Sequence, residues 1–154
     1  MGFTITQGLM LVLLIASTMA VSIARPFENS IKTPTPMKFI VGDSYHWNYG
    51  FNYTEWATKH GPFILNDTLV FKYDPTPKTI PHSVYLLPNQ ESFIKCDLKN
   101  AKMQGNTKQG AGNGFEFVLK ESQPHYFACG EHDGIHCLNG TMKFSVTPID
   151  PSHN

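Results

Sequence analysis

The chain has 154 residues, and its 12 Lys and Arg residues balance its 12 Asp and Glu residues, so it fits one domain with no formal net charge. Such a chain offers no basic field for a phosphate backbone, which disfavours nucleic-acid binding. Its 11 Phe, 6 Tyr and 2 Trp residues, together with 12 Gly and 11 Pro, favour short strands joined by turns and predict an all-β domain.

The N-terminus has the pattern of a targeting segment. Residues 9–21 are apolar and uncharged, and this stretch is short for a membrane span but typical of a signal-peptide core. Small residues before the cleavage point predict a signal peptide over residues 1–24, with cleavage after Ala20 or an uncleaved anchor helix as the alternatives. Residues 150–154 form a polar tail, so neither a GPI-type tail nor a transmembrane span is expected in the mature chain.

Secretion would expose the chain to oxidising conditions and to glycosyltransferases. Acceptor sequons begin at Asn52, Asn66 and Asn139, and we expect at least one of them to carry a glycan. The chain has three cysteines, so the simplest arrangement is one disulfide and one free thiol. A free thiol in an oxidising compartment needs a reason, such as metal ligation.

After a leader over residues 25–36, the domain is expected over residues 37–149. The one helix that the pattern predicts is short, over residues 53–59, with Asn52 as its N-cap. Period-2 alternation predicts the strands, and short strands separated by turns indicate a sandwich or barrel. The residues expected to share a face within successive strands are Leu69, Phe71 and Tyr73; His82, Val84 and Leu86; Phe115, Phe117 and Leu119; Phe127 and Cys129; and Met142, Phe144 and Val146.

The loop that joins the last two predicted strands crowds soft and borderline metal ligands together. It contains the Cys129 thiol, the imidazoles of His132 and His136, and the thioether of Met142. A thiolate and two imidazoles in one plane with a weak axial thioether are the ligand set of a blue copper electron-transfer site. His82, which begins a strand after a Pro-rich turn, is the candidate for the other histidine.

Five motifs lie along the chain: V-G-D-S followed by Trp47, N-Y-T-E-W-A from Asn52, D-T-L-V-F-K-Y from Asp67, Y-F-A-C-G from Tyr126, and H-C-L-N-G from His136. Together they resemble the phytocyanins, the plant branch of the cupredoxins that includes plantacyanins, stellacyanins and early nodulin-like proteins. V-G-D-S is similar to the family's opening strand. Over residues 38–148, the resemblance implies an all-β, Greek-key cupredoxin sandwich or barrel with one or two short helices.

The resemblance also implies the roles of individual residues. It assigns one type 1 copper site to His82, Cys129, His136 and Met142, and one disulfide to Cys96 and Cys137. The implied activity is single-electron transfer, without transformation of a substrate.

Two spacings depart from the family pattern. Six residues separate Cys129 from His136, and five separate His136 from Met142, where the family usually has four in each place. In a regular strand the second change would turn Met142 to the opposite face, so its ligation is expected to be less secure. His132 is the alternative to His136 as the second histidine ligand. We favour His136, because a disulfide at the neighbouring Cys137 would anchor it. The other histidines, His46, His60, His125 and His153, are expected to be solvated or satisfied locally.

The expected protein is a secreted monomer of the apoplast or cell wall, with the exposed edge of His136 as the exit for electrons. A glycan on Asn139 would shield that edge, so small redox molecules are favoured as partners over an unidentified redox protein. One alternative is a copper-free interaction module of the cell surface or wall. Another is a copper store or scavenger.

Overall fold

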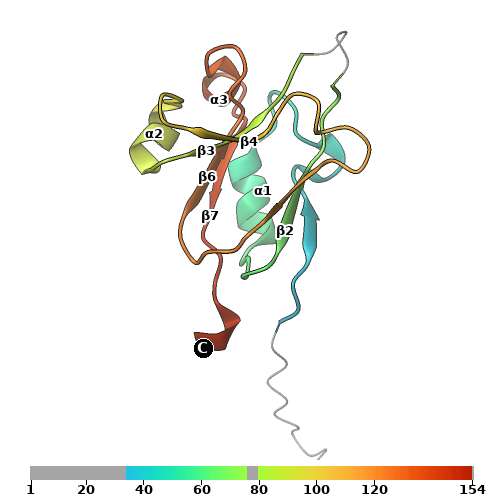
Figure 1. The fold of residues 1–154 in the computed structure, drawn as a ribbon, viewed down its shortest axis with the longest axis vertical. Helices are drawn as coiled ribbons and strands as arrows, with labels where there is room; N and C mark the ends of the chain where they lie inside the picture. Colours follow the sequence, from blue (N-terminus) through green and yellow to red (C-terminus); the bar gives the residue numbers. More distant parts are fainter. Residues whose placement is uncertain (1–33, 76–79, 154) are drawn as a thin grey trace, which may run out of the picture. The chain divides into compact units, whose positions relative to one another are not determined.

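The computed structural model of the protein describes residues 34–75 and 80–153 (Figure 1). The predicted signal peptide and residues 25–33 of the predicted leader lie outside the described residues. Within the described ranges, no helix has both the length and the apolar character that crossing a membrane requires.

The first sheet has the strand order β1-β2-β5 in the described part of the chain. Its strands are β1 (Lys38–Ile40), β2 (Thr68–Phe71) and β5 (Phe115–Val118). β1 runs parallel to β2, and β2 runs antiparallel to β5. β2 is the central strand, with a neighbour along each edge, and all four of its residues are buried rather than alternate ones.

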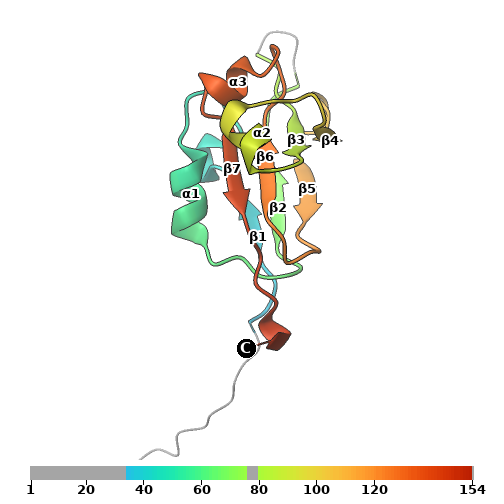
Figure 2. The same cartoon turned by 90° about the vertical axis from the view of Figure 1, so that its left-hand side faces the viewer.

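The second sheet has the order β4-β3-β6-β7, and each neighbouring pair is antiparallel. Its strands are β4 (Lys102–Gly105), β3 (Val84–Leu87), β6 (His125–Ala128) and β7 (Lys143–Val146). The two sheets face each other across the core (Figure 2). This arrangement confirms the predicted all-β sandwich.

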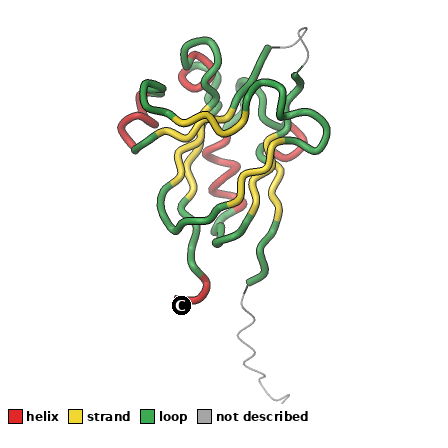
Figure 3. Tube along the Cα trace, viewed as in Figure 1, coloured by secondary structure: helices red, strands yellow, loops and turns green. Residues whose placement is uncertain are grey.

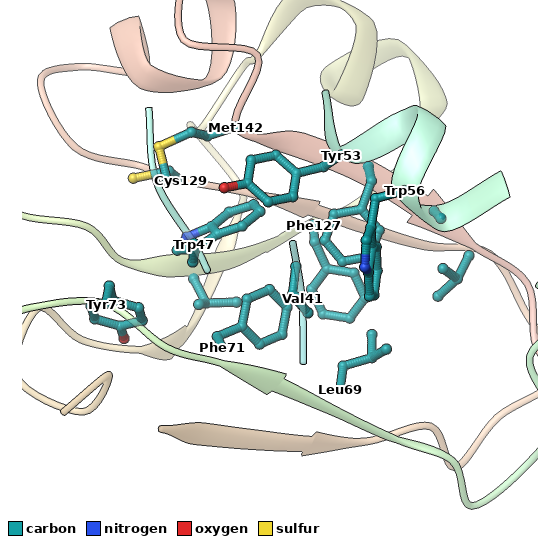
Figure 4. Close-up of a cluster of buried hydrophobic side chains, with 14 of the residues drawn as sticks. Val41, Trp47, Tyr53, Trp56, Leu69, Phe71, Tyr73, Phe127, Cys129 and Met142 are labelled. Carbon is teal, nitrogen blue, oxygen red and sulfur yellow. The ribbon is translucent and has the colours of Figure 1, made fainter. Parts of the chain in front are cut away.

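The predicted strand faces form the core between the sheets. Every apolar residue that the alternation assigned to a shared face lies in the main buried cluster or packs against it (Figure 4). Phe127 and Phe144 are fully buried with their ring centroids 5.1 Å apart. Ser145 and Thr147 on the other face are exposed, so the alternation in this last strand is as predicted.

The predicted helix is confirmed as α1 (Tyr53–His60), one residue longer than expected. Asn52 caps it, since its side-chain oxygen accepts a hydrogen bond from the Glu55 N–H at 3.1 Å. Tyr53, Trp56 and Ala57 are buried, and the helix packs beside β7 (Figure 2).

The expectation of a single helix is wrong. The structure also has α2 (Gln90–Lys95), α3 (Ile135–Leu138) and the 3-10 turns η1 (Asp43–Tyr45) and η2 (Pro151–His153) (Figure 3). Each has six residues or fewer, which is too short for a helical period to be recognised in the sequence.

The opening strand lies earlier than the V-G-D-S motif suggested. β1 ends at Ile40, and Gly42 and Asp43 have positive φ angles of 81° and 53°. A side chain at Gly42 would place its Cβ 2.3 Å from the His46 carbonyl oxygen. The motif therefore codes for the tight turn after the strand. At position 42 of this turn only glycine fits without strain.

A small second cluster covers the outer face of β3 and β6. It contains Leu87, Ala128 and the disulfide between Cys96 and Cys137. Cys96 follows α2 and Cys137 lies within α3, so the disulfide ties these two helices together beside the sheet. Cys129 is the free cysteine.

Candidate metal centre

Sheet pairing brings His82 and Cys129 to the same end of the sandwich. Cys129 directly follows β6, and His82 lies two residues before β3. These strands are antiparallel neighbours, with Tyr85 opposite Ala128. The end of one strand and the beginning of the other therefore meet. His136 approaches the same place from α3.

The donor atoms of these three residues form a compact triangle. Cys129 Sγ lies 3.4 Å from His136 Nδ1 and 3.9 Å from His82 Nδ1, and the two nitrogens are 3.3 Å apart. All three side chains are buried, with exposed fractions of 4% or less. One sulfur and two imidazole nitrogens arranged in this way suit a trigonal copper ion, so the residues present fit that metal.

Burial keeps these side chains uncharged in the absence of a metal. It lowers the pKa of His82 to about 4, with a smaller contribution from His136, and it lowers the pKa of His136 as well. Burial also raises the pKa of the Cys129 thiol, although hydrogen bonds from the backbone of Glu131 and Ser83 oppose this. Metal binding must therefore displace the thiol proton, and the imidazoles are already in the form that binds metal.

The copper-free protein should lose stability as the pH falls from about 6.5 to about 4. A histidine in the unfolded chain takes up a proton near pH 6.5, whereas folded His82 does so only near pH 4. Within this window the unfolded state binds more protons, so the free energy of unfolding decreases as the pH is lowered. Denaturant unfolding between pH 4 and 7.5 measures this slope. His82→Gln should flatten the slope, and an equal slope in that variant would contradict the assignment.

Ser83, which the sequence did not indicate as a site residue, makes one hydrogen bond to the thiol and two that hold it in place. Its N–H donates to Cys129 Sγ at 3.5 Å, and its hydroxyl accepts from the Gly130 N–H at 3.2 Å. Its carbonyl accepts from the Trp47 indole N–H at 3.0 Å. Hydrogen bonds around a ligating sulfur tune the properties of a copper site. In the sequence, the feature that could have indicated Ser83 is its position directly after the candidate ligand His82.

Met142 does not turn to the opposite face, because the additional residue of the spacing forms part of a turn before β7 begins. Thr141 has a φ of 53°, and the Lys143 N–H donates to its carbonyl at 2.7 Å, which closes a tight turn. The Thr141 side chain points outward and donates to the Phe51 carbonyl. Met142 is thus fully buried, and Figure 4 shows it beside Cys129 at one end of the core.

His132 lies outside the triangle of donor atoms. It is exposed, in a turn where His132, Asp133 and Gly134 all have positive φ angles. Of the two candidate histidines in the loop, the geometry places His136 against Cys129. The expected exposed edge of His136 is not present, because this side chain is only 3% exposed.

The three predicted glycosylation sites are on the surface. Asn52, Asn66 and Asn139 are all exposed, and Asn139 is the C-cap residue of α3, three residues from His136. Two of the remaining histidines are satisfied locally, as expected. His60 bonds to the Trp56 carbonyl and to Asp43, and His125 bonds to the Gln123 carbonyl.

Comparisons with known proteins find relatives among blue copper proteins and early nodulin-like proteins. A family model described as a plastocyanin-like domain matches residues 45–141. Blue copper protein 1b of Medicago truncatula is 31% identical over 112 residues, which cover 72% of this chain and 60% of that relative. Early nodulin-like protein 19 of Arabidopsis thaliana is 32% identical over 146 residues, 94% of this chain and 91% of the relative. The chain thus spans 60% of the length of the first relative and nearly all of the second.

Two solved structures have the same fold and confirm the predicted cupredoxin-like sandwich. Cucumber stellacyanin with Cu²⁺ is 26% identical, with a TM-score of 0.59 over 76% of this chain and 98% of that one. Cucumber basic protein, a blue copper protein, is 27% identical, with a TM-score of 0.55 over 73% of this chain and 99% of that one.

Proposed function

Because the chain belongs to the phytocyanin family, we propose that it binds one copper ion in a type 1 site and carries single electrons in the extracellular space. The observation that carries this proposal is the buried triangle of donor atoms from His82, Cys129 and His136. The Cys129 thiolate and the two imidazoles would hold the metal in a plane. Met142, buried beside the thiol, would supply the weak axial thioether.

Bound copper supplies a reversible one-electron change, and the chain's task is to keep the ligands in place. Pairing of β3 with β6 fixes the positions of His82 and Cys129, and the disulfide at Cys137 anchors α3, which carries His136. Ser83 holds the sulfur through its N–H. Electron transfer in a site of this kind transforms no substrate, so we propose a carrier rather than an enzyme.

Titration of the purified protein with Cu(II) tests this function. We expect an intense visible band that saturates at one copper per chain, bleaches with a reductant and returns on reoxidation. Retained copper without such a band would favour a copper store. If copper is neither retained nor stabilises the fold, the carrier proposal is lost, and a copper-free interaction module of the cell surface or wall becomes the better account.

Replacing Met142 with leucine should keep the copper band but raise the reduction potential. Leucine is similar in volume, so the cost in stability should stay below about 1.5 kcal/mol. The loss of a weak axial donor disfavours Cu(II) relative to Cu(I). Cyclic voltammetry measures the shift. The matched control is Met103→Leu, because Met103 is an exposed methionine of β4. Equal potentials in wild type and Met142→Leu would exclude axial ligation.

A glycan on Asn139 should favour small redox molecules over a protein as the partner. Asn139 is exposed at the end of α3, three residues from His136, so a glycan there would cover the approach to the site. We expect Asn139→Gln, expressed in a glycosylating host, to speed electron exchange with a redox protein more than with ascorbate. Asn66→Gln removes a sequon from another exposed position and serves as the control. Unchanged exchange in Asn139→Gln would refute the shielding.

A further inference from the structure

Two exposed rings cover His136. The Tyr49 ring meets it edge to face with centroids 5.6 Å apart, and the His132 ring lies tilted at 5.0 Å. Tyr49 is 47% exposed and His132 is also exposed, whereas His136, which both rings contact, is 3% exposed. The Nδ1 atom of the same His136 ring lies 3.4 Å from Cys129 Sγ, so the two exposed rings contact a side chain of the donor triangle.

Both covering residues are positioned by the backbone. A Cβ at Gly140 would lie 2.4 Å from the Tyr49 ring, so this ring packs directly on a glycine that leaves room for it. The Gly50 N–H donates to the Gly140 carbonyl at 2.8 Å and ties the Tyr49 segment to the end of α3. His132 lies in the turn before α3, where its carbonyl accepts from the Ile135 N–H at 3.0 Å.

We propose that Tyr49 and His132 form an aromatic cap that closes His136 off from molecules in solution. The consequence for electron transfer rests on the proposed function: a redox partner would contact the exposed rings of the cap and exchange its electron across them. Small solutes would reach His136 only when the cap opens. The cap itself is a property of the folded chain and needs no metal.

Chemical modification of the copper-free, folded chain tests the cap. Diethyl pyrocarbonate acylates accessible neutral imidazoles, and peptide mass spectrometry gives a rate for each histidine. In wild type, we expect His136 to react about tenfold more slowly than His132, because its reaction requires local opening. In Tyr49→Ser combined with His132→Asn, His136 should react several-fold faster than in wild type. Asparagine is chosen because it tolerates the positive φ of His132.

Two controls separate loss of the cap from loss of the fold. Tyr45→Ser removes a tyrosine that is 66% exposed and stacks on Phe51, and it should leave the His136 rate unchanged. His125 is buried at the far end of β6, so it should stay slow in every variant that remains folded.

The cap is refuted if His136 reacts as fast as His132 in wild type, or if the double variant leaves the His136 rate unchanged. Both readings are taken without copper. A chain with a protected His136 that then fails to bind copper would refute the proposed function and leave the cap standing. A chain that binds copper but has an unprotected His136 would do the reverse.

Discussion

Replacing Cys129 with serine is expected to abolish the intense visible band of the copper-loaded protein and to weaken copper retention strongly. The band of a blue copper site arises from charge transfer between a thiolate and the metal, and a serine hydroxyl is a harder donor that keeps its proton. The fold should survive. Cys129 is fully buried, but the Ser83 N–H that donates to its sulfur can donate to a hydroxyl instead, so about 1–3 kcal/mol is the expected cost.

Visible spectra and metal analysis of the Cys129→Ser variant measure both effects, and circular dichroism verifies the fold. The matched control is His125→Gln, which replaces a buried histidine of β6 that belongs to no cluster of possible metal ligands in the described residues. It should keep the band. A band of wild-type intensity in Cys129→Ser would mean that the triangle with His82 and His136 is not the copper site.

Removing the disulfide should cost about 4 kcal/mol of unfolding free energy and weaken copper binding. Cys96 and Cys137 close a loop of sequence separation 41, and in the chain-entropy model a loop of this size contributes that much by restricting the unfolded chain. The effect on copper has a local cause. Cys137 follows His136 within the four-residue helix α3, which is too short to hold its position by its own hydrogen bonds.

Cys96→Ser combined with Cys137→Ser is the variant to measure, by denaturant unfolding with and without copper. Leu138→Ala controls for any change within α3, since Leu138 lies in the same helix, is 54% exposed and forms no cross-link. Wild-type stability in the double variant would contradict the entropic account. A large loss of stability with unchanged copper affinity would show that other contacts, such as the cap, hold His136.

The sequence by itself determined the features that depend on local pattern. Alternation of apolar and polar residues gave the class of fold and the core faces of strands such as β7, because each side chain in a strand points opposite to its neighbours. Asn52 and the residues after it were sufficient to predict α1, because an N-cap acts within one helical turn. The crowding of Cys129, His136 and Met142 into one segment indicated the chemistry.

Only the tertiary structure decided which of these residues meet. His82 and Cys129 are brought together by the pairing of β3 with β6, and no local pattern specifies that pairing. The spacing alone predicted that Met142 would point away from the site. In the structure, the left-handed backbone conformation of Thr141 directs Met142 into the core beside Cys129. Tyr49 covers His136 from a segment more than eighty residues earlier in the chain. Such contacts depend on the packing of the whole domain. A local sequence pattern can therefore indicate candidate ligands but not the residues that pack against them.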